Sequence, residues 1–131
     1  MSAYIHDLQP RSNRRVVLAL PHSPLAALAT IQLRQRGWTV WPAATGDHAR
    51  RLAATHFPAA VVLAADTKNE SGWLTCAKLM LGQPRLRVLM VGELTAESSD
   101  LANYVGAESL LPEDIDAGDL IAEIEGVAVA A

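Results

Sequence analysis

Hydrophobic residues occur in five short runs along the chain, separated by longer stretches in which apolar and polar residues mix. Each run has the length of a buried strand and is too short for an ordinary helix. Strands are therefore predicted at 15–20, 38–41, 59–64, 87–91 and 109–111. In the stretches after them, apolar residues recur at helical spacing. Helices are predicted there, at 25–36, 48–55, 73–81, 98–105 and 116–125.

Residue types at the ends of the first predicted helix support its boundaries. Ser23 can accept a hydrogen bond from the first turn, and Pro24 suits the first helical position. Gly37 is expected to end the helix as the residue after its C-cap. The residues expected to face the core are Leu25, Leu28, Ile31 and Leu33 in this helix and Leu120, Ile121 and Ile124 in the last one.

Strands and helices alternate as (βα)5, and strands that are apolar throughout are typical of a parallel sheet covered on both faces. The predicted fold is α/β: a doubly wound five-stranded parallel sheet of the flavodoxin-like class. Such folds bind ligands at the carboxyl ends of their strands. The loops that make this edge here begin at Pro21, Ala64, Gly92 and Pro112.

Four segments are similar, in order and spacing, to the receiver domain of two-component response regulators. They are LRQRGWTV at 33–40, ATGDHA at 44–49, FPAAVVL at 57–63 and GAESLL at 106–111. The resemblance implies a receiver-like domain over residues 15–126. A flexible N-terminal arm is expected at 1–14 and a tail at 127–131.

The resemblance also implies five groups that an active receiver uses for aspartyl phosphotransfer. Two acids after the first strand and an aspartate at the end of the third hold Mg²⁺, and that aspartate is the phosphoacceptor. A Thr or Ser after the fourth strand and a Lys after the fifth contact the phosphoryl group. By spacing, the residues at these positions are Pro21, His22, Ala64, Gly92 and Glu113. Because all five groups are missing, we expect a degenerate pseudo-receiver that is not an enzyme.

Two alternatives remain open. Asp66, two residues after Ala64, is a possible displaced phosphoacceptor, which would make the chain an unconventional phosphorylatable receiver. The first loop contains no acid, and position 113 is a glutamate where a lysine would be needed, so neither position would assist Asp66. The second alternative is a small-molecule-binding flavodoxin-like domain, with a ligand near His22, Ala64 and Gly92. Without the acids, that crevice would suit a neutral or anionic ligand.

Charge is unevenly placed, although the net charge is only −3. Between Arg11 and Arg51 there are seven arginines and one acid, whereas between Glu93 and Glu125 there are ten acids and no lysine or arginine. The resemblance implies that the fourth helix, fifth strand and fifth helix form a surface for a signalling partner or a homodimer. A solvated surface without a partner is the simpler interpretation. The acids expected on this surface are Asp100, Glu108, Asp116, Asp119, Glu123 and Glu125.

Composition and motifs narrow the function classes. A single cysteine, Cys76, excludes a disulfide within the chain, and it is expected to pack inward from the third helix. The N-terminal stretch lacks an apolar signal-peptide core, and no apolar run has the length of a membrane span. We therefore expect a cytoplasmic protein, and the receiver resemblance implies a role in bacterial signal transduction. The scattered arginines accompany no nucleic-acid-binding motif, so direct contact with nucleic acid is not expected.

Histidines and tryptophans offer further candidate chemistry. His22 and His48 could approach the same edge of the sheet, but the spacing of His and Cys residues does not match a metal site. No metal and no cofactor are predicted. Trp38 and Trp41 belong to a predicted edge strand. They either pack against the first two helices or leave surface available to a partner.

Overall fold

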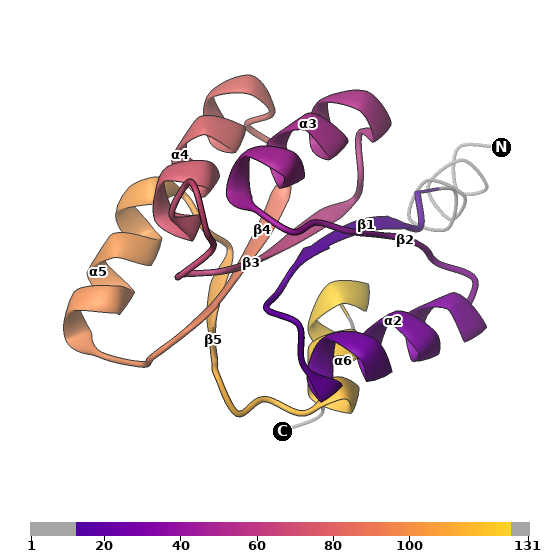
Figure 1. Ribbon diagram of the computed structural model, residues 1–131. Coiled ribbons are helices and arrows are strands. Elements are labelled where there is room, and N and C mark those ends of the chain that lie inside the picture. The colour runs from indigo at the N-terminus through magenta and orange to yellow at the C-terminus, as the bar shows by residue number, and fades with distance from the viewer. Residues whose placement is uncertain (1–12, 127–131) are drawn as a thin grey trace, which may run out of the picture.

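Five parallel strands form one sheet in the order β2-β1-β3-β4-β5 (Figure 1). This arrangement comes from a computed structural model that describes residues 13–126. Each strand lies within one residue of its predicted range. The strands are β1 Arg15–Ala19, β2 Thr39–Pro42, β3 Ala60–Ala64, β4 Arg87–Gly92 and β5 Ser109–Pro112. The predicted doubly wound parallel sheet is therefore confirmed.

A helix follows each strand and begins with a side-chain cap. The helices are α2 Pro24–Gln35, α3 Gly46–His56, α4 Gly72–Gly82, α5 Ala96–Val105 and α6 Ala117–Glu125. In each, the hydroxyl or carboxylate of the N-cap residue accepts a hydrogen bond from a backbone N–H in the first turn. The predicted cap Ser23 is confirmed, and Gly37 has the expected positive φ of 88°.

The two faces of the sheet are covered by different helices (Figure 1). Val16, Val62 and Leu89 point toward α2 and α6, whereas their neighbours Val17 and Val61 point toward α3 and α4. This alternation follows from the two-residue period of a strand. Because both faces are covered, the central strands are apolar throughout, which is the pattern that predicted them.

The prediction that Leu28 and Ile31 face the core is wrong. They are 49% and 54% exposed, whereas Ala29 and Leu33 are buried. Residues four apart lie on one side of a helix, so Leu25, Ala29 and Leu33 form the row that packs on the sheet. The inward positions predicted in α6 are confirmed, since Leu120, Ile121 and Ile124 are buried.

Most of the predicted arm and all of the predicted tail lie outside the described residues. The last two arm residues are tied to the domain: the Asn13 Nδ2 group donates to the Phe57 carbonyl at 3.4 Å, and the Arg14 Nη1 group donates to the Arg36 carbonyl at 2.8 Å. Between residues 13 and 126, none of the helices has the length and apolar character needed to cross a membrane.

Candidate functional site

The sheet order places the change of winding direction between β1 and β3. From β1 the chain moves outward to β2 on one side, and from β3 it continues through β4 to β5 on the other. Loops that leave the carboxyl ends of β1 and β3 therefore diverge, which in folds of this kind opens a crevice for ligands. The predicted location of the functional edge is consistent with this topology.

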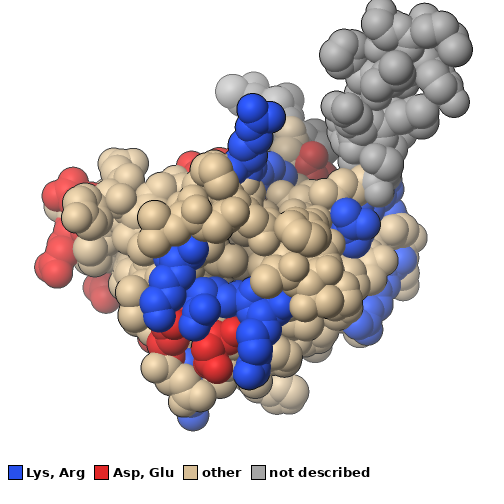
Figure 2. Space-filling model, turned by 90° about the horizontal axis from the view of Figure 1, so that it is seen from above, with Lys and Arg blue, Asp and Glu red and all other residues tan. Residues whose placement is uncertain are grey.

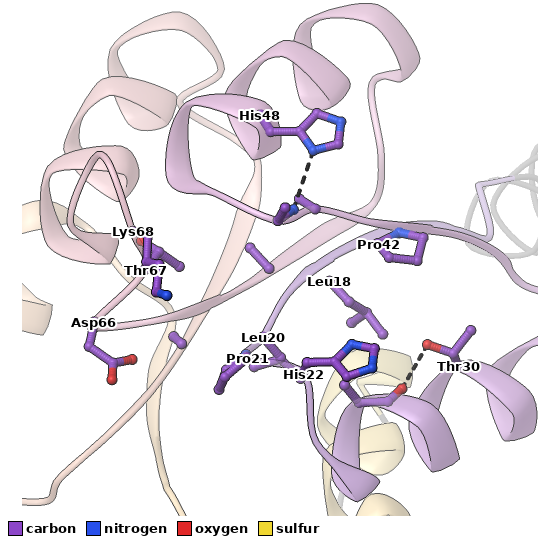
Figure 3. A pocket seen from close by; sticks show the side chains of 15 residues that line it. Leu18, Leu20, Pro21, His22, Thr30, Pro42, His48, Asp66, Thr67 and Lys68 are labelled. Atoms are coloured by element: carbon purple, nitrogen blue, oxygen red, sulfur yellow. Dashed lines mark hydrogen bonds between the residues drawn. The ribbon is translucent and has the colours of Figure 1, made fainter.

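A pocket of about 580 Å³ lies at this edge. The carboxyl ends of β1 and β3 form its base, with the buried side chains of Leu18, Ala19 and Ala64. His22 and Thr30 lie on the α2 side and His48 on the α3 side (Figure 3). The loop after β3 closes a third side with Asp66, Thr67 and Lys68 (Figure 3).

The five positions that spacing assigns to receiver chemistry lie in two places. Pro21, His22 and Ala64 line the pocket. Gly92 ends β4 beside Pro112, and Glu113 follows β5 as an exposed residue; neither lines the pocket. The crevice that the sequence placed around His22, Ala64 and Gly92 therefore extends toward β2 instead, where Pro42, Ala43 and Ala44 complete its wall.

Asp66, the possible displaced phosphoacceptor, is exposed at the rim of the pocket. Within residues 13–126, its carboxylate has no hydrogen bond or ion pair. No other carboxylate among the described residues lines this pocket. Mg²⁺ prefers several oxygen ligands in octahedral geometry, so a single carboxylate is a poor site for it.

Sequence reasoning did not identify the buried carboxylate of Glu70, four residues beyond Asp66. Arg50 binds it with two hydrogen bonds, Nε to Oε2 at 2.8 Å and Nη2 to Oε1 at 3.0 Å. Lys78 Nζ donates to Oε1 at 2.8 Å and the Thr75 hydroxyl donates to Oε2 at 2.6 Å. The paired Arg50 guanidinium, together with Lys78 and Thr75, lowers the pKa of Glu70 to about 2 against the opposing effect of burial. We call Glu70, Arg50, Thr75 and Lys78 the Glu70 cluster.

The Glu70 cluster joins α3 to α4 and to the loop before α4. Figure 2 looks down on this side of the molecule, where basic side chains surround a small acidic group. Helix α3 comes close because Gly46 has no side chain: a Cβ there would collide with the Thr75 hydroxyl and the Glu70 carbonyl. No local sequence pattern signals this cluster, because Arg50 and Glu70 are twenty residues apart and meet only in the fold.

The predicted acidic surface contains carboxylates in two different states. Glu108 forms an ion pair with Arg87 at 2.7 Å. Arg36 bridges both oxygens of Glu125 and the Trp38 indole donates to one, which lowers the pKa of that carboxyl. The acids that form no ion pair within residues 13–126 are Asp100, Asp116, Asp119 and Glu123. Further acidic side chains lie at the left edge of Figure 2, where α5 is located.

The other candidate residues have ordinary structural environments. Cys76 is fully buried as predicted, and this burial raises the pKa of its thiol to about 11, so it is a poor nucleophile. Trp38 is buried and Trp41 stacks on His56 with ring centroids 3.9 Å apart, which favours packing over partner binding. His22 and His48 reach the same pocket, but no three His, Cys, Asp or Glu side chains in the described part of the chain could hold a metal ion.

The fold is shared with solved receiver domains. A CheY-like response regulator receiver domain protein from Methanospirillum hungatei superposes with a TM-score of 0.80 at 17% identity, covering 87% of this chain and 92% of that one. A chemotaxis protein from Vibrio cholerae gives a TM-score of 0.79 at 17% identity, covering 88% and 98%. No protein-family model and no curated protein sequence matches the chain. At these identities the likeness establishes the receiver fold alone.

A third neighbour supplies a chemical contrast. It is a response regulator from Burkholderia pseudomallei with a phosphorylated aspartic acid, a calcium ion and citrate. The TM-score is 0.76 at 21% identity, over 86% of this chain and 66% of that chain. The present chain shares its fold with this protein, and the residue that spacing assigns to the phosphoacceptor position is Ala64.

Proposed function

We propose that this protein is a phosphorylation-independent pseudo-receiver that acts by binding another protein in bacterial signal transduction. The observation that carries the proposal is that Ala64, which spacing assigns to the phosphoacceptor position, ends β3 and is buried with 4% exposure. A methyl group has no oxygen with which to form an acyl phosphate or to bind Mg²⁺.

The surrounding positions support the same conclusion. Proline at 21 offers no ligand atom, and a neutral imidazole at His22 is a poor ligand for a hard cation. Glu113 places an anion where a receiver would place a lysine that contacts the phosphoryl group. Like charges repel, so this exchange opposes the binding of a phosphoryl group. A domain that has this fold but cannot be phosphorylated would act on a pathway by binding other proteins through its surface.

Intact-mass spectrometry after incubation with acetyl phosphate and Mg²⁺ tests the loss of phosphotransfer. We expect no gain in mass. A gain of one phosphoryl group that Asp66→Ala abolishes would contradict the proposal and identify an unconventional receiver. A gain that survives in Asp66→Ala would also contradict it, since another side chain would then be the acceptor.

The acidic surface over α5, β5 and α6 is the proposed site for a basic partner or for a second copy of the chain. Asp119 and Glu123 lie one helical turn apart on α6 and are unpaired within the described residues. Charges at the rim of an interface steer association and make it sensitive to salt. Glu108 and Glu125 have a smaller part in this surface than the sequence suggested, because Arg87 and Arg36 already neutralise them.

The charge-reversal variant Asp119→Lys/Glu123→Lys tests this surface. Its matched control is Asp66→Lys/Ala54→Lys/Leu81→Lys, which makes the same total change in charge at exposed positions outside α5, β5 and α6. Sedimentation velocity of the three proteins at low and high salt measures self-association. If all three are monomeric, affinity capture should retain a basic protein with the wild type and the control but not with the α6 variant. Equal behaviour of the two variants in both measurements would contradict this choice of surface.

A further inference from the structure

The pocket at the ends of β1 and β3 has no part in the proposed protein surface, and its size suits a small ligand. Pockets that bind small molecules commonly measure about 300–1,000 Å³ and combine an apolar lining with a few polar groups. At about 580 Å³ this pocket lies within that range. In place of metal-binding acids, the first loop contributes the proline ring of Pro21 and the imidazole of His22.

The lining of the pocket is mainly apolar. Leu18, Ala43 and Ala64 are buried beneath it, and Leu20 and Pro42 extend the apolar wall toward solvent (Figure 3). None of these five residues carries a charge. A fully hydrated ion would gain little from such a lining, whereas an organic molecule would bury its own apolar surface there.

Several hydrogen-bonding groups of the pocket are already paired within the protein. The Ala44 N–H donates to His48 Nδ1 at 3.3 Å, so the ring proton of the neutral imidazole lies on Nε2. The hydroxyl protons of Thr30 and Thr67 are already donated to the carbonyls of Ala26 and Glu70. These two hydroxyls therefore contribute no donor to a ligand.

One lysine, one carboxylate and two histidines lie around the opening. His22, His48 and Lys68 stand on three sides of it, and Asp66 is its single carboxylate within residues 13–126 (Figure 3). Lys68 has no ion pair in the described part of the chain and remains available to an anion. A ligand with one negative group would thus meet donors at the rim while its apolar body occupies the base.

We propose that this pocket binds a small organic anion, with an apolar body of ring size and one acidic group directed toward Lys68 and His22. The proposal is independent of the protein-binding role. It gives the domain a place for a chemical signal at the edge where an active receiver would be phosphorylated.

A fluorescence titration of the full chain with 8-anilinonaphthalene-1-sulfonate, an aromatic monoanion, tests the proposal. We expect one site per chain. Lys68→Glu should weaken binding about fivefold or more, because it replaces an attractive charge with a repulsive one at the rim. Asp66→Asn should strengthen binding about twofold, since it removes the opposing charge. Both residues are exposed, so the folded structure should tolerate these changes.

Matched variants separate this pocket from other apolar surfaces. Ala44→Phe fills the mouth of the pocket and should abolish the site, whereas Ala54→Phe, on the exposed side of α3, should leave it intact. Arg85→Glu makes the same charge change as Lys68→Glu away from the pocket and should have no effect. Uncharged N-phenyl-1-naphthylamine should bind wild type and Lys68→Glu equally. Binding that is insensitive to both Ala44→Phe and Lys68→Glu would overturn the proposal.

Discussion

Two carboxylates in the same loop between β3 and α4 have opposite environments. Glu70 is buried and makes four hydrogen bonds to Arg50, Thr75 and Lys78. Asp66, four residues earlier, is exposed at the rim of the pocket and has no side-chain partner within residues 13–126. The sequence draws attention to Asp66, because it lies near the phosphoacceptor position, and gives no sign of Glu70.

The difference shows that this loop has two parts. We call Thr67, Glu70 and Gly72, which are hydrogen-bonded within the loop, its fixed part, and the exposed residues Asp66 and Lys68 its open part. On the α4 side, the Thr67 hydroxyl donates to the Glu70 carbonyl and the Gly72 N–H donates to the Ala65 carbonyl, which holds the chain near β3. On the pocket side, Asp66 and Lys68 are exposed. An acid near the predicted phosphoacceptor position is therefore not by itself evidence of chemistry, and the carboxylate with more interactions, Glu70, links α3 and α4.

The largest effect should come from Gly72, where the fixed part of the loop contacts β3. A Cβ at this position would collide with the Ala64 carbonyl, which is backbone and cannot move aside. We expect Gly72→Ala to lower the free energy of unfolding by about 3 kcal/mol, near the upper end for overpacking. Gly82→Ala is the control, because no atom lies within 4 Å of a Cβ there. Urea denaturation measures both, and equal stabilities would show that the loop does not depend on this contact.

Glu70→Gln should have the next largest effect. The amide keeps the shape of the carboxylate but loses its charge. Only one of its two polar atoms is an oxygen that can accept hydrogen bonds, whereas Arg50, Thr75 and Lys78 donate to both carboxylate oxygens of Glu70. Hydrogen bonds to charged groups are stronger than neutral ones, so we expect a loss of about 2 kcal/mol in urea denaturation. The control is Asp66→Asn, the same chemical change in the open part of the loop. A loss as large in the control would remove the distinction between the two acids.

The dependence of stability on pH should report on Glu70. The pKa of Glu70 is lowered from 4.5 to about 2 in the folded protein, so its ionised form stabilises the fold. That contribution is fully present above about pH 4.5 and is lost as the pH falls toward 2. Because Arg50 and Lys78 are partly exposed, we expect a loss of about 1–2 kcal/mol over this range. Stability measured against pH should show a smaller decrease in Glu70→Gln, and parallel curves would argue against the lowered pKa.

Local signals allowed the fold to be predicted, and long-range packing limited the prediction of the site. The strands were apparent because each is a short apolar run, and the hydroxyl cap Ser23 indicated where the first helix begins. The error at Leu28 and Ile31 arose because α2 packs through alanine and leucine four residues apart, so the small Ala29 lies where a larger side chain was expected.

Residue types and their spacing also led to the prediction that the receiver groups are missing, and Ala64 ends β3 as that prediction requires. The extent of the pocket could not be predicted in this way. It depends on how Pro42 and His48, from β2 and α3, pack beside the end of β1. The Glu70 cluster likewise requires α3 and α4 to lie side by side, a contact that neither helix encodes alone.

The smallest effect should come from Asp66→Ala. Exposed side chains without partners usually contribute less than about 0.5 kcal/mol, and the carboxylate of Asp66 has no partner in the described part of the chain. Urea denaturation at neutral pH should therefore give the same midpoint and slope as the wild type. A loss above about 1 kcal/mol would show that Asp66 makes an interaction of its own and that the open part of the loop is not open. An unchanged stability would mean that any effect of Asp66 on a bound anion arises at the pocket and not through the fold.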